Sequence, residues 1–332
     1  MKLIESSVEI LPQEEGLLGA YKQCEIAGRT AYKSLDKMTD DSAKKFVDAM
    51  CKSNHGAVLE HGTIYLHFSY CSPIHDINYM KLVSIRLFYE RNPYSKVVIK
   101  TEDHYKIDVY ITTNCRVIFE HDRNDDLQYL CEPTKHHEKR ITARFICSRG
   151  VSHEAVRHRK FSFLQESQRY CMYSRERMGG EITYIIPEWV KSRVYEIADT
   201  INPLTGTSNN YILDEQTIPD IIRIHMLASD RATNCWWESL KKAEEDYMYL
   251  LIDECGLKAE EARGVLLNDC KTELIMTGFI SDWKHFFDLR SKGTTGKPHP
   301  DIKVLADDLL SQFTEANRCI LIISGIVGSS RI

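Results

Sequence analysis

The sequence predicts an α/β protein with a large share of helix, and three observations support this prediction. Of the 332 residues, 43% are hydrophobic and 27% are charged, which is the balance of a globular protein with a core of normal size. Short segments of alternating apolar residues predict strands, and longer segments with apolar residues at helical spacing predict helices. Neither a repeat nor a clear linker divides the chain, so we expect a single domain over residues 1–332.

Two segments predict half-buried strands, because apolar side chains recur at every second position and so lie on one face. The first segment covers residues 63–70 and the second covers residues 141–147. The residues on these faces are Ile64, Leu66 and Phe68 in the first segment, and Ile141, Ala143, Phe145 and Cys147 in the second. We expect the second strand to lead into a turn and then a helix over residues 148–159.

Several other segments predict helices from their apolar spacing and from residues that start or stop a helix. A capped helix is expected to end near Gly56, another helix to stop at Gly256, and a third to begin with Pro300 in its first turn. The apolar residues Met276, Ile280, Trp283 and Phe287 are spaced along one helical face. The predicted helical segments are residues 39–56, 234–256, 257–270, 276–290 and 299–313.

Residues 71–140 differ from the rest of the chain, because they are more polar and rich in tyrosine. Residues 108–120 within this region predict a strand and a helix of its own. We therefore expect an insertion at about 71–140 that forms a separate lobe. Nothing in its sequence assigns it a function, and a surface elaboration is favoured over a module that binds a partner.

The composition also excludes several classes of protein. A formal net charge of −5 argues against general nucleic-acid binding, which needs a positive field. No run of about 18 apolar residues predicts a membrane span, and the N-terminus lacks the apolar centre of a signal peptide. The eleven cysteines are scattered without CxxC spacing, which favours reduced thiols and a cytoplasmic location. His153 and His158 are one residue too far apart for an HExxH zinc site, so no metal is expected.

One stretch, residues 157–169, concentrates positive charge in this acidic chain. Arg157, His158 and Arg159 are adjacent, and Arg169 follows. Like charges repel unless an anion lies among them, and guanidinium groups bind phosphate oxygens in pairs. The stretch therefore predicts a phosphate of a nucleotide or cofactor, although a solvated face with carboxylate partners also fits the pattern. Ser167 lacks the neighbouring base that a serine nucleophile needs.

The same stretch carries a resemblance to a known family. RHR followed by seven residues and serine resembles the signature of the flavin-dependent thymidylate synthases, the ThyX family. Four further segments are similar to motifs of that family, and the classical Pro-Cys-His nucleophile motif of flavin-free thymidylate synthases is absent. These segments are AGRTAYKS (27–34), HGAVLEH (55–61), ARGVLL (262–267) and HFFDLR (285–290). The resemblance implies the fold of that family, a mixed sheet with substantial helix, interrupted here by the inserted lobe.

The resemblance also implies a reaction. It implies that the chain converts dUMP to dTMP with FAD as cofactor, methylenetetrahydrofolate as carbon donor and NADPH as reductant, and that it forms a homotetramer with shared active sites. By resemblance, the dUMP pocket contains Glu154, Arg157, Gln165, Glu166, Ser167, Gln168, Arg169, Arg263 and Arg290. By resemblance, FAD is bound by Glu60, Arg157, His158, Arg159, Gln165 and His285, and His55 lies near the folate.

The residue types suit this chemistry. Arg290 matches the arginine thought to act on the uracil ring, where a guanidinium stabilises negative charge that develops on the ring. Arginine stays protonated at neutral pH, so it polarises the ring rather than removing a proton. Because the flavin carries the hydride, no protein nucleophile is required.

Three positions depart from the pattern of the family and keep alternatives open. Phe279 stands where the family often has asparagine near the flavin, Ser281 where arginine is common, and Leu266 where proline is frequent. One alternative is an inactive homologue that binds nucleotide but not flavin. Another is a protein that binds single-stranded nucleic acid, because residues 157–163 and 169–177 combine cations with aromatic rings.

Overall fold

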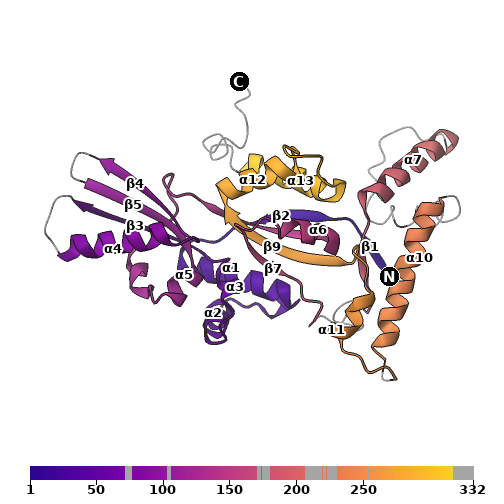
Figure 1. Ribbon diagram of the computed structural model, residues 1–332, viewed down its shortest axis with the longest axis horizontal. Coiled ribbons are helices and arrows are strands. Elements are labelled where there is room, and N and C mark those ends of the chain that lie inside the picture. The colour runs from indigo at the N-terminus through magenta and orange to yellow at the C-terminus, as the bar shows by residue number, and fades with distance from the viewer. Residues whose placement is uncertain are drawn as a thin grey trace.

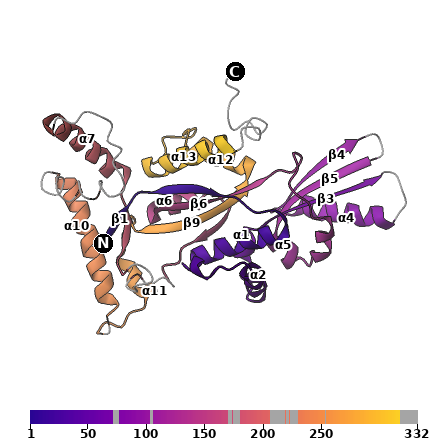
Figure 2. The ribbon, with the colours of Figure 1, turned by 180° about the vertical axis from the view of Figure 1, so that it is seen from behind.

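The computed structural model arranges three sheets and their helices along one elongated molecule (Figures 1 and 2). A three-stranded sheet lies at one end, a four-stranded sheet lies in the middle, and the helices α7 and α10 lie at the other end. The structure describes residues 1–71, 77–102, 106–169, 173, 180–205, 219, 222, 230–252 and 254–316.

The strands pair in three separate sheets. The four-stranded sheet has the order β2-β6-β9-β7 and the three-stranded sheet the order β3-β5-β4, and both are antiparallel throughout. Only β1 and β8 pair in parallel within the described residues. The strands are β1 Lys2–Ile4, β2 Ser7–Leu11, β3 Thr63–Cys71, β4 Lys96–Glu102, β5 Lys106–Asn114, β6 Arg140–Ser148, β7 Ser162–Gln165, β8 Thr183–Ile185 and β9 Lys271–Phe279. The α/β class is confirmed, but parallel and antiparallel pairing occur in different sheets.

The helices surround these sheets. The α-helices are α1 Gly16–Ala31, α2 Ser42–Lys52, α3 Gly56–Leu59, α4 Ile77–Arg91, α5 Cys115–Glu120, α6 Arg149–Ala155, α7 Glu188–Thr205, α10 Arg231–Leu250, α11 Ala259–Ala262, α12 Ile280–Arg290 and α13 Pro300–Ala316. Short 3-10 helices are η1 Leu35–Lys37, η2 Asn124–Tyr129 and η5 Arg263–Val265. In the described part of the chain, every helix is too short or too polar to span a lipid bilayer.

The four-stranded sheet forms the centre of the molecule. Helices α6, α12 and α13 cover one face and α1 packs against the other (Figures 1 and 2). Ala143, Phe145 and Cys147 of β6 join the core beneath α12 and α13, so the predicted strand over 141–147 is confirmed. The helix α6 follows at once, and its first turn is capped by Ser148 Oγ, which accepts from the backbone N–H of Val151.

The strand predicted at 63–70 is confirmed as β3, with Ile64, Leu66 and Phe68 all buried. The strand and helix predicted within 108–120 correspond to β5 and α5. The strand β5 pairs with β3 along its whole length. The predicted lobe therefore shares one sheet with a strand that precedes residue 71, and the boundaries of the insertion stay a prediction.

Three helix predictions were wrong in extent. The helix expected over 39–56 ends at Lys52, because Asn54 adopts a left-handed φ of 56° that turns the chain before α3. Within 257–270 only two short turns form, α11 and η5, and extended backbone at Leu266 stops them. The predicted stop at Gly256 lies after the end of α10 at Leu250, and Gly256 itself has a φ of 65°.

The helix predicted over 276–290 is correct only from Ile280 onward. Residues 271–279 form β9, which lies between β6 and β7. A strand inside a sheet covered on both faces is almost uniformly buried and lacks the alternation that reveals a strand. Met276 packs into the same core as Trp283 and Phe287, which explains why the apolar spacing continued across the boundary. The helix beginning at Pro300 is confirmed as α13.

Candidate active site

The fold brings the ends of α6 and α12 together. Since β6 and β9 are antiparallel, the helices that follow them start at opposite ends of the sheet and cover the same face. Arg290 is the last residue of α12, and its Nη1 donates to Glu154 Oε2 of α6 at 2.7 Å. Its Nη2 also donates to the backbone carbonyl of Glu154 at 3.2 Å. Arg290 is thus fixed by two bonds while 21% of its side chain is still exposed.

His158 completes this group as a neutral imidazole. Its Nε2 accepts from Arg290 Nε at 3.1 Å, and its ring lies 6.2 Å from that of His285. Burial lowers the pKa of His158 to about 4, with further contributions from Arg290 and His285. An uncharged ring can sit beside a guanidinium without repulsion, so the group carries the charge of Arg290 and Glu154 alone at neutral pH.

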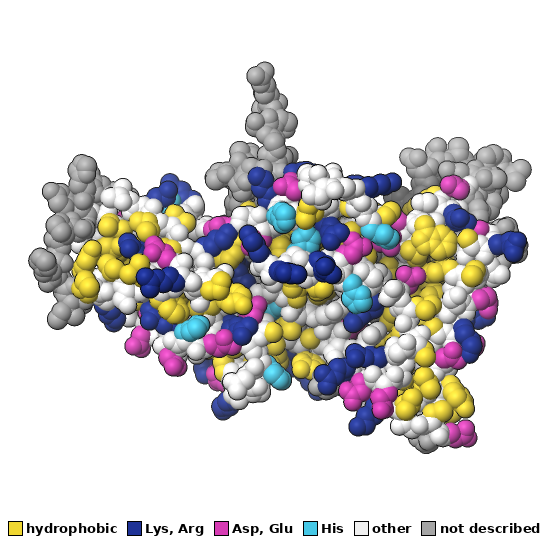
Figure 3. Space-filling model, viewed as in Figure 1, with side chains coloured by type: hydrophobic (Ala, Val, Ile, Leu, Met, Phe, Trp, Pro, Cys, Tyr) yellow, Lys and Arg dark blue, Asp and Glu magenta, His cyan; other side chains and the backbone are white. Residues whose placement is uncertain are grey.

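Arg157 and Arg159 flank His158 and differ from it sharply. Both are exposed, and neither has an ion pair or side-chain hydrogen bond with any residue the structure describes. Figure 3 shows Lys, Arg and His side chains gathered on the middle of the molecule, over the region of α6 and α12. Two guanidinium groups without a partner beside an exposed arginine fork suit the oxygens of a phosphate.

Glu166 lies in a different environment, although it is only seven residues beyond Arg159. Its side chain is completely buried and contacts two lysines, with Oε1 3.2 Å from Lys33 Nζ and Oε2 3.0 Å from Lys271 Nζ. The hydroxyl of Tyr173 donates to it at 3.3 Å. Burial alone would lower the pKa of Lys271, but the carboxylates of Glu166 and Glu273 more than offset this and raise it.

A cavity of about 390 Å³ brings other predicted residues together. His55 and α3 line one side of it, and Gln165 and Ser167 line another. Gln165 Nε2 donates to Ser152 Oγ of α6 at 2.7 Å and to Thr272 Oγ1 of β9 at 3.2 Å. Because Ser152 and Glu154 share α6, Gln165 connects this cavity to the group around Arg290.

The remaining predicted dUMP residues lie near α11. Arg169 Nε is 3.3 Å from Glu260 Oε2, and Arg263 begins η5 directly after α11 with its side chain exposed. Gln168 is buried, and its Nε2 contacts Cys270 Sγ at 3.6 Å. These residues form a third group, separate in its contacts from Arg290.

Glu60 and the departures at 279 and 281 contact the three-stranded sheet instead. Glu60 pairs with Arg116 of α5 at 2.5 Å. Lys96 of β4 lies 4.5 Å from the ring centre of buried Phe279 and donates to Ser281 Oγ at 2.6 Å. A strand of the lobe therefore reaches the start of the helix that carries His285 and Arg290.

Sequence reasoning missed the lysines that hold Glu166. Lys33 lies inside the AGRTAYKS motif, and its φ of 46° is unusual for a residue with a side chain. The motif was therefore a usable signal for Lys33, whereas nothing near Lys271 in sequence pointed to it. Part of the aromatic and basic stretch at 169–177 lies outside the described residues.

Comparisons with known proteins agree with these motifs. Residues 133–317, more than half of the chain, match the family model described as thymidylate synthase complementing protein. A protein of Pyrococcus furiosus named flavin-dependent thymidylate synthase is 29% identical over 144 residues, 43% of either chain. A protein of Corynebacterium aurimucosum with the same name is 31% identical over 148 residues, 43% of this chain and 46% of the other.

The chain thus matches about half the length of these curated relatives. Among solved structures, the UMP/dUMP methylase PolB from Streptomyces cacaoi, bound with 5-Br dUMP, aligns with 98% of this chain and 99% of its own. The sequence identity of that alignment is 15% and the TM-score is 0.41.

Proposed function

This chain belongs to the thymidylate synthase complementing protein family, and on that premise we propose that it is a flavin-dependent thymidylate synthase. It converts dUMP to dTMP, with methylenetetrahydrofolate as carbon donor, NADPH as reductant and FAD as cofactor. The observation that carries the proposal is Arg290, fixed by Glu154 and neutral His158 beside two arginines without a partner.

The residues present fit FAD by their chemistry. The guanidinium groups of Arg157 and Arg159 are exposed and have no anionic partner among the described residues, so they are available to the diphosphate of FAD. Bound FAD supplies the hydride chemistry that amino-acid side chains lack. The residues proposed to hold it are Glu60, Arg157, His158, Arg159, Gln165 and His285.

Arg290 is the proposed catalytic residue. Its guanidinium cannot lose its proton at neutral pH, so it stabilises negative charge on the uracil ring as a fixed cation. Glu154 and His158 each take one edge of the guanidinium and restrict its orientation before substrate arrives. Such preorganisation lowers the barrier because no reorientation is needed during the reaction.

The other proposed dUMP contacts fall into two sets. Ser167 and Gln165 line the cavity that also contains His55, the proposed folate neighbour, whereas Arg169 and Arg263 lie near α11. Gln168 lies between these sets in sequence. Glu166 is proposed to act indirectly, because its carboxylate is already bound by two lysines and it fixes the backbone on which Gln165 and Ser167 lie.

We further propose a homotetramer in which several copies complete each active site. The separate groups around Arg290, the His55 cavity and α11 are consistent with different parts of one chain contributing to different sites. The chain is proposed to be one domain over 1–332 with the lobe at about 71–140 inserted, and its scattered cysteines favour a cytoplasmic location.

An anaerobic visible spectrum with Arg290→Met tests the proposal. Wild-type protein supplied with FAD should show a flavin spectrum that bleaches with NADPH and dUMP, and it should form dTMP when methylenetetrahydrofolate is added. Arg290→Met should keep the flavin spectrum and lose about 100-fold to 1000-fold in kcat, the typical effect of removing one oxyanion donor. Arg144→Met, at an ion pair with Glu9 on the β2–β6 edge, is the matched control and should keep wild-type activity.

A second candidate is a nucleotide-binding homologue without flavin, favoured by Phe279 and Ser281. Phe279 is buried, with Lys96 and Arg140 over its ring at 4.5 Å and 5.6 Å, so this position presents an occupied aromatic face instead of an amide. Wild-type protein that stays colourless with FAD but binds dUMP would favour this second candidate and overturn the first.

A further inference from the structure

Arg116 joins the three-stranded lobe to α3. It lies in the first turn of α5, which begins where β5 ends. Its Nη1 contacts Glu60 Oε1 at 2.5 Å, and its Nε donates to Glu120 Oε1 at 2.8 Å. Glu120 and Glu60 together raise the pKa of Arg116 further above its usual range. One guanidinium thus bridges a carboxylate on α5 and the carboxylate that ends α3.

The same ion pair packs against the other end of α3. Gly56 is the first residue of this helix, and a Cβ at that position would lie 2.9 Å from Arg116 Nε and still closer to Glu120 Oε1. Only a glycine lets the backbone approach the pair this closely. Arg116 therefore contacts α3 at its start through packing and at its end, Glu60, through an ion pair.

The helix α3 depends on such contacts for its position. It contains four residues, Gly56–Leu59, and a single turn is not stable on its own because helix nucleation is costly. Val58 and Leu59 anchor its inner side in the core. The rotation of the turn about this anchor is limited on the outer side by Arg116 and Glu120.

His55 and Gly56 transmit this position to the cavity. His55 precedes the first residue of α3, and His55, Gly56, Ala57 and Val58 line the 390 Å³ cavity opposite Gln165 and Ser167. We propose that Arg116 is a positioning residue that holds α3, and with it His55, in place at the active site. This inference rests on the proposed function, because it takes the His55 cavity as part of that site.

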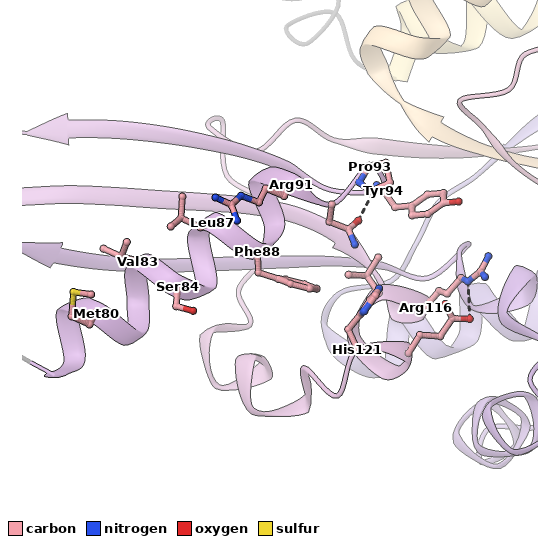
Figure 4. Close-up of a pocket in the computed structure, with 13 residues that line it drawn as sticks. Met80, Val83, Ser84, Leu87, Phe88, Arg91, Pro93, Tyr94, Arg116 and His121 are labelled. Atoms are coloured by element: carbon pink, nitrogen blue, oxygen red, sulfur yellow. Dashed lines mark hydrogen bonds and ion pairs between the residues drawn. The ribbon is translucent and has the colours of Figure 1, made fainter.

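Arg116 also lines a groove on the lobe that supplies a matched control. The groove has a volume of about 730 Å³ between α4 and α5. Figure 4 shows Arg116 and His121 toward one end and Met80 at the other, with Arg91 between them. Arg91 is exposed and has no partner among the residues described, so Arg91→Met removes the same charge from the same groove without touching α3.

The test compares Arg116→Met with Arg91→Met by amide hydrogen exchange of the chain without ligands. Exchange in residues 56–61 should be at least about tenfold faster in Arg116→Met, because local opening sets the exchange rate. Arg91→Met should match wild type there. Arg116→Lys keeps a cation that reaches only one carboxylate, so it should give an intermediate rate and serves if Arg116→Met does not fold.

Turnover provides the second readout. In Arg116→Met, kcat for dTMP formation should fall about tenfold through the displaced His55 wall, while KM for dUMP should change less than about twofold. The melting temperature should fall by no more than about 4 °C, since exposed ion pairs contribute little to stability.

The outcomes separate the inference from the function. Unchanged exchange at 56–61 in both Arg116 variants overturns the inference whatever the activity. Faster exchange with unchanged kcat in an active enzyme also overturns it. A wild-type protein that makes no dTMP refutes the proposed function, whereas the exchange result still decides whether Arg116 holds α3.

Discussion

Two halves of one short stretch show opposite treatments of charge. In residues 157–159 the arginines are exposed and without partners among the described residues. In residues 165–168 the charged member, Glu166, is buried completely between Lys33 and Lys271. Sequence alone gave the two halves equal weight as parts of a nucleotide site. The difference teaches that charge left without a partner by folding is available to a ligand, whereas charge already paired serves the fold.

The physical basis of this contrast is desolvation. A buried carboxylate is strongly destabilised unless cations and hydrogen bonds replace its water, and Glu166 has two lysines and Tyr173. An exposed guanidinium keeps its water and costs the fold little. Substitutions in the two halves should therefore differ in the free energy of unfolding, and the following predictions are ordered by that effect.

The largest effect is expected for Glu166→Gln. It leaves Lys33 and Lys271 without their shared carboxylate, and removing one partner of a buried ion pair typically costs about 3–5 kcal/mol. Lys33 is 25% exposed and can turn toward water, so we expect a value near the lower limit. Urea denaturation measures it. Glu154→Gln is the control: its carboxylate is 32% exposed, and an equal loss of stability there would contradict the contrast.

An intermediate effect is expected from pH, because His158 is the one buried side chain within residues 157–159. Its folded pKa of about 4 lies below the ordinary value of 6.5. As pH falls below 6.5 the unfolded chain gains a proton that the folded chain does not, so stability decreases toward pH 4. The slope is about 1.4 kcal/mol per pH unit for each such histidine.

His61 contributes in the same direction, since burial, aided by Arg140, lowers its pKa to about 3. Urea denaturation at pH 7 and pH 5 measures the combined loss. His158→Gln should remove about half of it, whereas His121→Gln, at an exposed position, should leave it unchanged. A His158→Gln protein with the full wild-type pH dependence would show that His158 is not neutral in the folded state.

The sequence predicted local features better than distant pairings. The strand at 141–147 was found because its apolar face alternates, and β9 was missed because burial on both faces removed the alternation. Within the site, the crowded cations at 157–159 are visible as a local pattern. The partners of Glu166 are Lys33, 133 positions earlier, and Lys271, 105 positions later, and no local pattern predicts a contact that only the sheet creates.

The smallest effect on stability is expected for the double variant Arg157→Gln, Arg159→Gln. Neither side chain has a described partner to lose, so the free energy of unfolding should change by less than about 0.5 kcal/mol. Binding should change far more, because a hydrogen bond to a charged group contributes about 1.5–3 kcal/mol. We expect FAD affinity to fall at least about tenfold, measured by flavin fluorescence titration.

Arg123→Gln provides the opposite control from the lobe. Arg123 pairs with buried Asp126 at 2.7 Å and lies 4.6 Å from the ring centre of Phe88, so its loss should reduce stability and leave FAD affinity unchanged. If the double variant at 157 and 159 instead loses stability and keeps its affinity, the two arginines have structural partners in the assembled protein. The contrast would then belong to the isolated chain alone, and the anion site would have to be sought around Arg169 and Arg263.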